Sequence, residues 1–487
     1  MSRNNIIPSP ERYISLSGFA RIGKEISFLY PEEAEETAKI FLEATERTNG
    51  NGYPIQAVLI EGLEEEEYRL TIRENRTIIA ASSVHGLHIG LESLRQLIYI
   101  YGEIIPCQAI KDKPVYSWRG FMLDCCRHFF PAEYVKKLID AASLYHLSVF
   151  HWHLTEDQGW RIEIKKYPEL TEKGSWAFTH TSPAFEGDHQ YYTQDEIRDI
   201  VDYAAKRFIT VVPELEMPGH ASAWLKSMPE LGCTGGPYQT ETRFGVFRDI
   251  LCAGNDKVFE VISDVLDEYC DLFPSGYIHI GGDEAPTDRW QECPKCRKRA
   301  EENGLDPKEL QYWFSQKVIE IVKSKGRTPV GWDEIANPIL QGHHFDKDLT
   351  LMLWRGKDAL KRSLEEGHKI VLSRCDDGAY LDYRQKDDQA EPGNLGITTL
   401  RRAYSMTTSY PELENNENIL GGQANIWSEK ILFPMHATYM IFPRLLAVAE
   451  AFWTKDSEKC YDDFVRRLEP MKKELAHCGL TFDFVID

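Results

Sequence analysis

The chain of 487 residues is long enough for a barrel of about 250 residues and an accessory domain. Hydrophobic residues make up 42% of it and aromatic residues 11%, which excludes global disorder. The formal net charge of −21 opposes binding to nucleic acid and to anionic membranes, so a neutral substrate is expected.

The first eight residues lack the apolar core of a secretory signal, and no apolar run of about 18 residues occurs along the chain. These features predict a cytoplasmic protein without an ordinary membrane span.

Residues 1–112 are predicted to form a small α+β domain. Apolar residues recur at helical spacing over 32–45 and 84–98, and strand patterns occupy 55–60, 68–72 and 77–81. No residues in this part have the composition of a catalytic site. The segment 111–114 indicates a linker to a second domain, predicted over 113–487.

From Trp118 onward, strand patterns alternate with helical patterns. The predicted strands are 118–123, 147–154, 209–215, 277–280, 328–331, 350–354, 369–372 and 419–424, and the predicted helices include 132–145, 193–206, 257–272, 308–325 and 439–452. Eight strands with intervening helices predict an α/β fold of the (β/α)8 TIM barrel type.

The segment 277–286 combines a short buried strand, two glycines and the adjacent acids Asp283 and Glu284. In a β/α barrel, functional side chains lie at the C-terminal ends of the strands, so catalysis is expected there. Two carboxylates this close disfavour ionising both, which separates their pKa values and can keep one protonated near neutral pH. The alternative is a solvated acidic pair that caps the next helix.

The other predicted strands also end in polar or aromatic residues. Each of these could be a structural ion pair or a core aromatic on its own. Around one barrel mouth they would form a pocket with tryptophan walls and acids and an arginine inside, which is the composition of a sugar-binding site. The candidates are Arg127, Glu156, His220, Trp332, Trp354, Tyr380, Asp382, Trp427 and Glu429.

Several separated motifs resemble, in order, those of the family 20 glycoside hydrolases, the β-N-acetylhexosaminidases. The signature is the His-Ile-Gly-Gly-Asp-Glu segment at 279–284, and the matching segments are 119–124, 127–129, 151–154, 218–220, 331–334, 380–382 and 422–429. The resemblance covers the whole predicted barrel, and residues 1–112 resemble the small domain that precedes it in that family.

The resemblance implies an exo-acting enzyme that removes terminal, non-reducing β-linked GlcNAc or GalNAc with retention of configuration. Glu284 would protonate the glycosidic oxygen. Asp283 would hold the acetamido N–H and stabilise positive charge while the acetamido oxygen attacks C1, giving an oxazolinium intermediate. Adjacent acids suit this substrate-assisted exception among glycosidases, because most glycosidases place two carboxyls on opposite sides of the scissile bond.

The resemblance also implies how the sugar is held. Tyr380 would hydrogen-bond to the acetamido oxygen. The tryptophans that would enclose the acetamide and stack on the ring are Trp332, Trp354 and Trp427. The polar residues that would bind the hydroxyls of a terminal sugar are Arg127, Asp382 and Glu429.

Two positions depart from the family pattern. Family members commonly have Asp where this chain has Glu156, in a relay that runs through His220 to the catalytic acid. The extra methylene of Glu can shift the relay geometry while keeping its charge. Glu216 stands where Asp is often found, and only a scaffolding role is assigned to it.

Two alternatives stay open: a family relative with a narrower glycan substrate, and a non-catalytic sugar-binding barrel. The intact acid pair argues against the second, because a lectin needs no general acid. The expected partners are β-N-acetylhexosaminide glycans, with no nucleic acid, no membrane and no cofactor. The sequence does not decide between GlcNAc and GalNAc or set the oligomeric state, a homodimer being one of the states it allows.

The eleven cysteines are odd in number and include the adjacent Cys125 and Cys126, which indicates reduced thiols rather than a disulfide framework. Cys293 and Cys296 could supply two zinc ligands, but structural zinc sites use four Cys or His ligands and no second pair is evident. No metal is therefore predicted, and a reduced pair that stabilises a loop is the expectation. His151 and His153 are expected to be hydrogen-bonding residues behind the barrel mouth rather than ligands.

Overall fold

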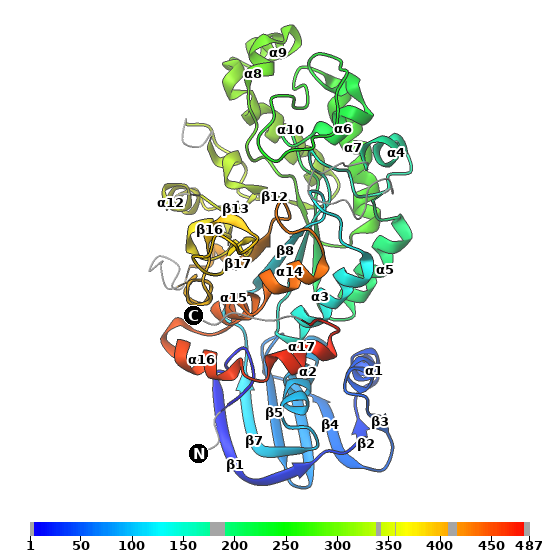
Figure 1. The fold of residues 1–487 in the computed structure, drawn as a ribbon, viewed down its shortest axis with the longest axis vertical. Coiled ribbons are helices and arrows are strands. Elements are labelled where there is room, and N and C mark those ends of the chain that lie inside the picture. The colour runs from blue at the N-terminus through cyan, green and yellow to red at the C-terminus, as the bar shows by residue number, and fades with distance from the viewer. Residues whose placement is uncertain (1–3, 176–189, 338–341, 356, 408–415, 482–487) are drawn as a thin grey trace.

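A computed structural model describes residues 4–175, 190–337, 342–355, 357–407 and 416–481 (Figure 1). Its larger domain is a closed barrel of parallel strands, in the order β10-β11-β12-β13-β14-β17-β8-β9. The bounds are β8 (Trp118–Asp124), β9 (Val149–His153), β10 (Thr210–Glu214), β11 (Tyr277–His279), β12 (Thr328–Trp332), β13 (Thr350–Leu353), β14 (Lys369–Leu372) and β17 (Ile419–Ile426). All eight predicted strands and the TIM-barrel fold are confirmed.

The barrel strands are buried on both faces. Every residue of β8 and β9 is buried, including Arg119 and His151, because the strands lie between the filled barrel interior and the outer helices. This burial explains why the strands read as nearly continuous apolar runs rather than as alternating patterns.

The longer helices after the strands are α3 (Ala132–Leu144), α5 (Gln194–Ala205), α7 (Asp256–Leu272), α10 (Leu310–Ser324), α12 (Lys357–Glu365), α14 (Pro434–Ile441) and α15 (Arg444–Trp453). The prediction of a single helix over 439–452 is wrong, because the helix is interrupted between α14 and α15. Phe442 is extended, with φ −102° and ψ 142°, since the following Pro443 disfavours a helical residue before it and has no N–H to donate.

Shorter elements are inserted between these units. They are α4 (Glu169–Gly174), α6 (Ser222–Ser227), α8 (Asp288–Glu292), α9 (Pro294–Glu302), α13 (Leu400–Tyr404), the strands β15 (Tyr383–Arg384) and β16 (Asn394–Ile397), and the helical turns η3 (Pro229–Leu231), η4 (Pro307–Glu309), η5 (Asp333–Ala336), η6 (Cys375–Asp377) and η8 (Asp456–Glu458).

The N-terminal domain is a seven-stranded mixed sheet in the order β1-β7-β5-β6-β4-β2-β3, with helices α1 and α2. Its elements are β1 (Arg12–Arg21), β2 (Glu25–Leu29), η1 (Glu32–Ala34), α1 (Glu35–Ala44), β3 (Thr48–Asn49), β4 (Tyr53–Leu59), β5 (Tyr68–Arg73), β6 (Arg76–Ala81), α2 (Val84–Tyr101) and β7 (Ile104–Asp112). The three predicted strands correspond to β4, β5 and β6.

Four strands of this sheet were not predicted. A register shift between Ser15 and Phe19 interrupts β1, and Gly18 there has φ +95°, so the alternating pattern is broken. Pro106 lies within β7, and proline disfavours a strand because it has no N–H to donate to a neighbouring strand. The linker predicted over 111–114 begins later than expected, because Asp112 still belongs to β7 and the barrel starts at Trp118.

The two domains are joined by buried polar contacts. The guanidinium of Arg95 on α2 bonds to Asp140 on α3 at 2.7 Å. The C-terminal helices α16 (Tyr461–Arg467) and α17 (Met471–His477) lie between the sheet and the barrel (Figure 1). Arg467 on α16 forms two bonds of 2.7 Å to Glu450 on α15, and its Nη1 also donates to the carbonyl of Ile6. These contacts attach the N-terminal segment to the barrel.

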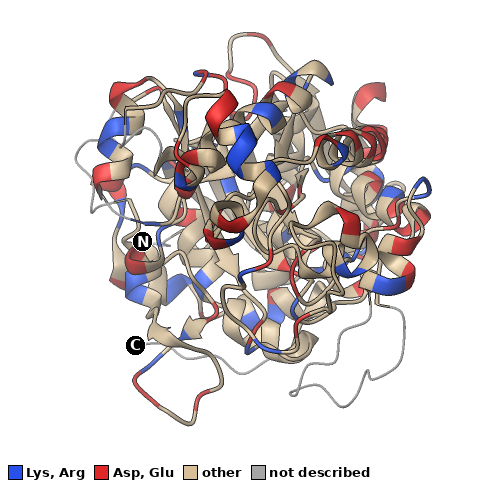
Figure 2. Cartoon of the chain, turned by 90° about the horizontal axis from the view of Figure 1, so that it is seen from above, with Lys and Arg blue, Asp and Glu red and all other residues tan. Residues whose placement is uncertain are grey.

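Acidic and basic residues are interspersed along the chain, with 77 acidic residues against 56 basic ones (Figure 2). Within the described ranges, no helix combines the length and the apolar composition that a membrane crossing requires.

Candidate active site

The C-terminal ends of the barrel strands surround a cavity of about 310 Å³, which is at the lower end of the range for small-molecule sites. The predicted site residues line it, with the exceptions of Glu156 and His220, which lie behind it. The lining consists of Arg127, Asp283, Glu284, Trp332, Trp354, Tyr380, Asp382, Tyr383, Asn394, Leu395, Gly396, Trp427 and Glu429.

The aromatic walls of this pocket are held by carboxylates behind them. The ring centroids of Trp332 and Trp427 are 5.7 Å apart, and Tyr380 stacks with Trp354 at 6.3 Å. The indole N–H of Trp332 donates to Glu214 at 2.7 Å, and that of Trp354 donates to Glu334 at 2.7 Å. Because each ring is anchored by its polar edge, its apolar faces stay available to the cavity.

Two glycines place the acidic pair at the end of β11. Gly281 and Gly282 have φ values of +63° and +97°, which side chains rarely adopt. A Cβ on Gly281 would also lie 2.1 Å from Glu216 Oε1, so only glycine permits this approach. The next residues, Asp283 and Glu284, turn into the pocket, and Glu284 itself has φ +47°. Such backbone strain is concentrated at functional sites.

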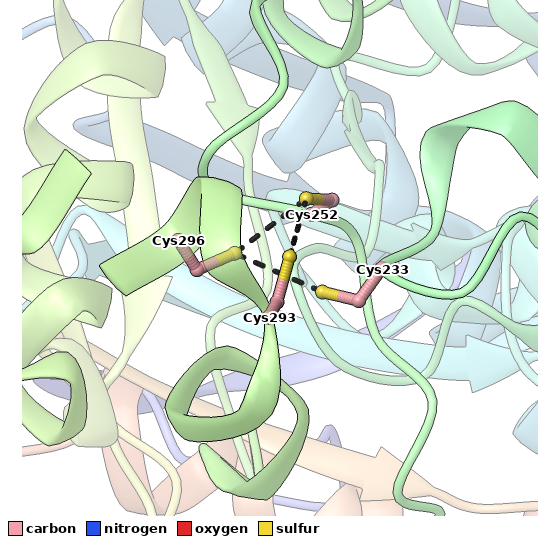
Figure 3. A group of neighbouring side chains, drawn as sticks. All are labelled: Cys233, Cys252, Cys293 and Cys296. Carbon is pink, nitrogen blue, oxygen red and sulfur yellow. Dashed lines mark hydrogen bonds between the residues drawn. The ribbon is translucent and has the colours of Figure 1, made fainter. Parts of the chain in front are cut away.

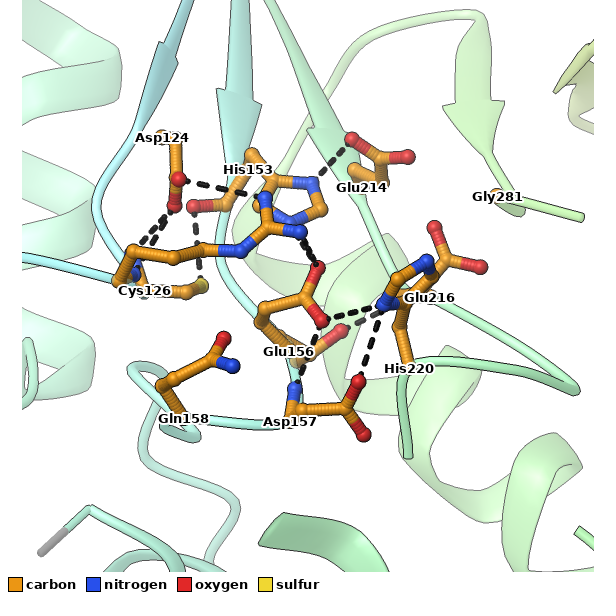
Figure 4. Close-up of polar contacts among 12 residues, drawn as sticks. Asp124, Cys126, His153, Glu156, Asp157, Gln158, Glu214, Glu216, His220 and Gly281 are labelled. Atoms are coloured by element: carbon orange, nitrogen blue, oxygen red, sulfur yellow. Dashed lines mark hydrogen bonds and ion pairs between the residues drawn. The ribbon is translucent and has the colours of Figure 1, made fainter. Parts of the chain in front are cut away.

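His220 lies directly behind the acidic pair, with its Nε2 3.4 Å from Glu284 Oε2. Its Nδ1 is 2.7 Å from Glu156 Oε1 and 3.0 Å from Asp157 Oδ2 (Figure 4). Burial opposes a charge on the imidazole, but the surrounding carboxylates, Glu156 foremost, outweigh it and raise the pKa of His220 well above its ordinary value. His220 is therefore a cation enclosed by anions.

Glu284 is the more exposed member of the pair, with 39% of its side chain accessible. The imidazole of His220, whose Nε2 lies 3.4 Å from Glu284 Oε2, lowers the pKa of Glu284, and partial burial opposes this only in part. In the open pocket the proton shared by Glu284 and His220 therefore resides on the imidazole. A molecule that covers Glu284 removes water from it and favours the protonated carboxyl.

Asp283 and Glu216 form a second interacting pair of carboxyls. Burial, reinforced by the charge of Asp283, raises the pKa of Glu216 well above its usual range. Burial also raises the pKa of Asp283, but the charge of His220, 3.7 Å from Asp283 Oδ2, opposes this and favours the proton on Glu216 and the charge on Asp283. Asp283 Oδ1 is buried and has no hydrogen-bond partner in the described part of the chain. This oxygen can therefore accept a hydrogen bond from a bound molecule.

Arg127, Asp382 and Glu429 contribute further polar groups to the pocket lining. Arg127 contacts Asp124 at 3.3 Å and Glu156 at 2.9 Å, and it lies over the ring of Trp427 at 5.1 Å from the centroid. Burial, followed by the nearby Glu429, raises the pKa of Asp382 to about 8. These groups are positioned to bind hydroxyls.

A chain-wide comparison with protein families matches residues 116–456 to the glycosyl hydrolase family 20 catalytic domain and residues 3–113 to domain 2 of the same family. The chain belongs to glycosyl hydrolase family 20. The family predicted from the sequence motifs is thus confirmed.

Related family 20 proteins cover nearly the whole chain. A β-hexosaminidase of Porphyromonas gingivalis is 41% identical over 94% of the chain, which spans 60% of that relative. A β-hexosaminidase of Akkermansia muciniphila is 34% identical over 91% of both proteins. A Vibrio harveyi exo-β-N-acetylglucosaminidase, solved with N-acetylglucosamine, superposes with a TM-score of 0.89 and 31% identity, covering 98% of this chain and 78% of that one.

A further family 20 structure matches in length as well as in fold. The β-N-acetylhexosaminidase of Bacteroides fragilis has a TM-score of 0.86 and 31% identity, with 99% of this chain and 97% of that one covered.

Some contacts of this family 20 site were not expected from the sequence. His220 contacts Asp157 as well as Glu156, and Asp157 also accepts from the hydroxyl of Ser222 at 2.6 Å. Glu216 was assigned only a scaffolding role, yet it accepts from the Gly282 N–H at 3.1 Å and interacts with Asp283. Only its place after a barrel strand pointed toward the site.

The β15–β16 insertion also contributes unexpected pocket residues. Asn394 donates to Asp382 at 2.8 Å and to Glu429 at 3.4 Å, and Leu395 is 95% exposed at the cavity edge. No motif marked these residues. By contrast, His153 hydrogen-bonds to Glu214 inside the barrel and His151 hydrogen-bonds to Gln423 at 2.9 Å, so both are hydrogen-bonding residues behind the mouth.

Proposed function

We propose that this chain is an exo-acting β-N-acetylhexosaminidase that removes terminal β-linked GlcNAc or GalNAc with retention of configuration. The observation that carries the proposal is the buried, unpaired Oδ1 of Asp283 beside Glu284, described above. A 2-acetamido group supplies the N–H donor that this anion lacks. The N-acetylglucosamine complex of the Vibrio harveyi relative supports a sugar of this kind.

The first chemical step breaks the bond between C1 and the leaving oxygen. Glu284 donates its proton to that oxygen while the acetamido oxygen forms a bond to C1, closing an oxazolinium ring. Asp283 accepts the acetamido N–H and stabilises the positive charge that develops on the ring. Tyr380 donates its hydroxyl to the acetamido oxygen and orients it for attack.

The second step reverses the first with water as the acceptor. Ionised Glu284 takes a proton from water, the water oxygen bonds to C1 on the face that the leaving group vacated, and the oxazolinium ring opens. Two inversions at C1 retain the configuration. His220 holds the shared proton between turnovers, while Glu216 keeps Asp283 ionised by remaining protonated itself.

The remaining pocket residues select the substrate. Trp332 and Trp427 offer apolar faces to the acetamide and the sugar ring, while Arg127, Asp382 and Glu429 bind the hydroxyls. A pocket of about 310 Å³ accommodates one terminal sugar rather than the interior of a chain, which supports exo action.

The test compares 4-nitrophenyl glycosides of β-GlcNAc, β-GalNAc and β-glucose. We expect turnover of at least one N-acetylhexosaminide and scarcely any of the glucoside, because the glucoside lacks the internal nucleophile. Comparable kcat/KM for the glucoside would overturn the proposal. Binding of GlcNAc without turnover of any of the three would favour the sugar-binding alternative.

A further inference from the structure

Four cysteines converge outside the active-site pocket (Figure 3). Cys293 and Cys296 flank the start of α9, and they meet Cys233 and Cys252 from the segment between η3 and α7. The expectation that no second pair accompanies Cys293 and Cys296 is therefore wrong. The partners lie far upstream, and their separation matches no short zinc motif, so spacing alone could not reveal them.

The sulfur–sulfur distances are those expected between thiolates that share one metal ion. Cys252 Sγ is 3.5 Å from the sulfur of Cys296 and 3.9 Å from that of Cys293, and Cys233 Sγ is 3.8 Å from that of Cys296. All four atoms lie within 4.8 Å of one another. Zinc–sulfur bonds of about 2.3 Å place the corners of a tetrahedron about 3.8 Å apart, which agrees with these separations. Disulfide sulfurs would be about 2.05 Å apart.

We propose that these four cysteines bind one Zn²⁺ ion in a structural site. Four thiolates complete the tetrahedral coordination of zinc and leave no position for water or substrate, so the ion has no part in the hydrolysis. Cys252, Cys293 and Cys296 are buried and Cys233 is partly exposed, so the site is shielded but reachable.

The local backbone is built for this arrangement. Pro294 begins α9 directly after Cys293, and Cys296 lies in the first turn of the helix. Gly254 packs so closely on this turn that a Cβ there would lie 2.2 Å from the carbonyl carbon of Lys295. A side chain at this position would therefore displace the turn that carries Cys296.

The site would connect two insertions that reach the active site. The segment from Cys233 to Cys252 has little regular structure, and its residues 242–245 line a second cavity together with Asn394 and Glu429 of the pocket rim. At its base, Leu251 N–H donates to the carbonyl of Pro218, two residues before His220. The other two cysteines follow β11, which carries the acidic pair. Zinc would therefore anchor the loop that forms the rim.

Metal analysis of the purified full-length chain tests the proposal directly. After expression in zinc-supplemented medium and purification without chelators, we expect about one zinc per chain. An organomercurial should release it in proportion to the thiols modified. Cobalt substitution should produce thiolate-to-metal charge-transfer absorption. Substoichiometric zinc with four freely reactive thiols would overturn the proposal, as would disulfide-linked peptides containing these cysteines.

Matched variants separate this site from the other thiols. Cys252→Ser and Cys293→Ser should lose the zinc, whereas Cys460→Ser, at an exposed position away from the cluster, should keep it. A chelator should lower the Tm of the wild type and of Cys460→Ser. If the Cys252→Ser chain is insoluble, the wild-type metal content still decides. Retention of a full equivalent of zinc in both cluster variants would refute the assignment.

Discussion

Removal of His220 should change the pH dependence of hydrolysis more than any other single substitution near the acid. His220 and Glu284 share one proton, and the raised pKa of His220 keeps that proton on the pair above pH 6.5. In His220→Gln the imidazole is gone, the lowering influence on Glu284 disappears, and the carboxyl returns toward an ordinary pKa of about 4.3. The proton is then lost at much lower pH.

The two pKa values set the size of the effect. The alkaline limb of kcat/KM should move to lower pH, from above 6.5 toward the ordinary range of a carboxyl near about 4.3. A carboxyl at that ordinary pKa is protonated in only about 1 in 500 molecules at pH 7. Above the new limb, kcat/KM should fall about tenfold per pH unit, because protonated Glu284 is required.

The assay is kcat/KM from pH 4 to 9 with N,N′-diacetylchitobiose, whose leaving group needs protonation, and with a 2,4-dinitrophenyl β-N-acetylhexosaminide, whose leaving group does not. The displacement should be large for the first substrate and small for the second. His344→Gln, which removes a 73% exposed imidazole, serves as the control and should keep the wild-type profile. Coincident alkaline limbs for the wild type and His220→Gln on chitobiose would refute the shared-proton assignment.

Substitutions at four further positions test the site and the fold. Glu284→Gln should reduce turnover about 10²–10⁴-fold for poor leaving groups but less for dinitrophenyl glycosides, and equal losses on both would assign the acid to another residue. Asp283→Asn should lower kcat more than it raises KM in steady-state kinetics. Glu216→Gln should stay within about tenfold of wild-type kcat while Glu216→Ala does not, because glutamine preserves the neutral donor; a large loss in both would mean that Glu216 acts as an anion. Arg467→Ala should cost about 3–5 kcal/mol in urea unfolding, since it leaves the carboxylate of Glu450 unpaired in the core, and an unchanged midpoint would show that the pair is not stabilising.

The barrel and most of its pocket could be predicted from the sequence because strand ends meet at one mouth. Trp332, Tyr380 and Trp427 each follow or end a predicted strand, so the fold itself brings them together. The positions of the glycines before the acidic pair were also informative, since a strand that stops at two glycines leaves its next side chains at the rim.

The features of the site that could not be predicted from the sequence depend on contacts between distant segments. Asn394 enters the pocket from an insertion whose two short strands carry no strong pattern. The interaction of Glu216 with Asp283 exists only because β10 and β11 are neighbours in the barrel. In the same way, Cys233 and Cys252 reach Cys293 and Cys296 through the packing of two loops rather than through a recognisable spacing.

In the proposed mechanism the acetamido oxygen is the nucleophile, and its reactivity can be varied without changing the enzyme. Aryl β-glycosides with one leaving group and with N-acetyl, N-fluoroacetyl, N-difluoroacetyl or N-trifluoroacetyl groups should show kcat/KM falling with each fluorine, because fluorine withdraws electron density from the attacking oxygen. The alternative is direct attack by Asp283 on C1. A flat series, together with a glycosyl ester trapped on Asp283 by a slow fluorosugar and seen by mass spectrometry, would contradict substrate-assisted catalysis.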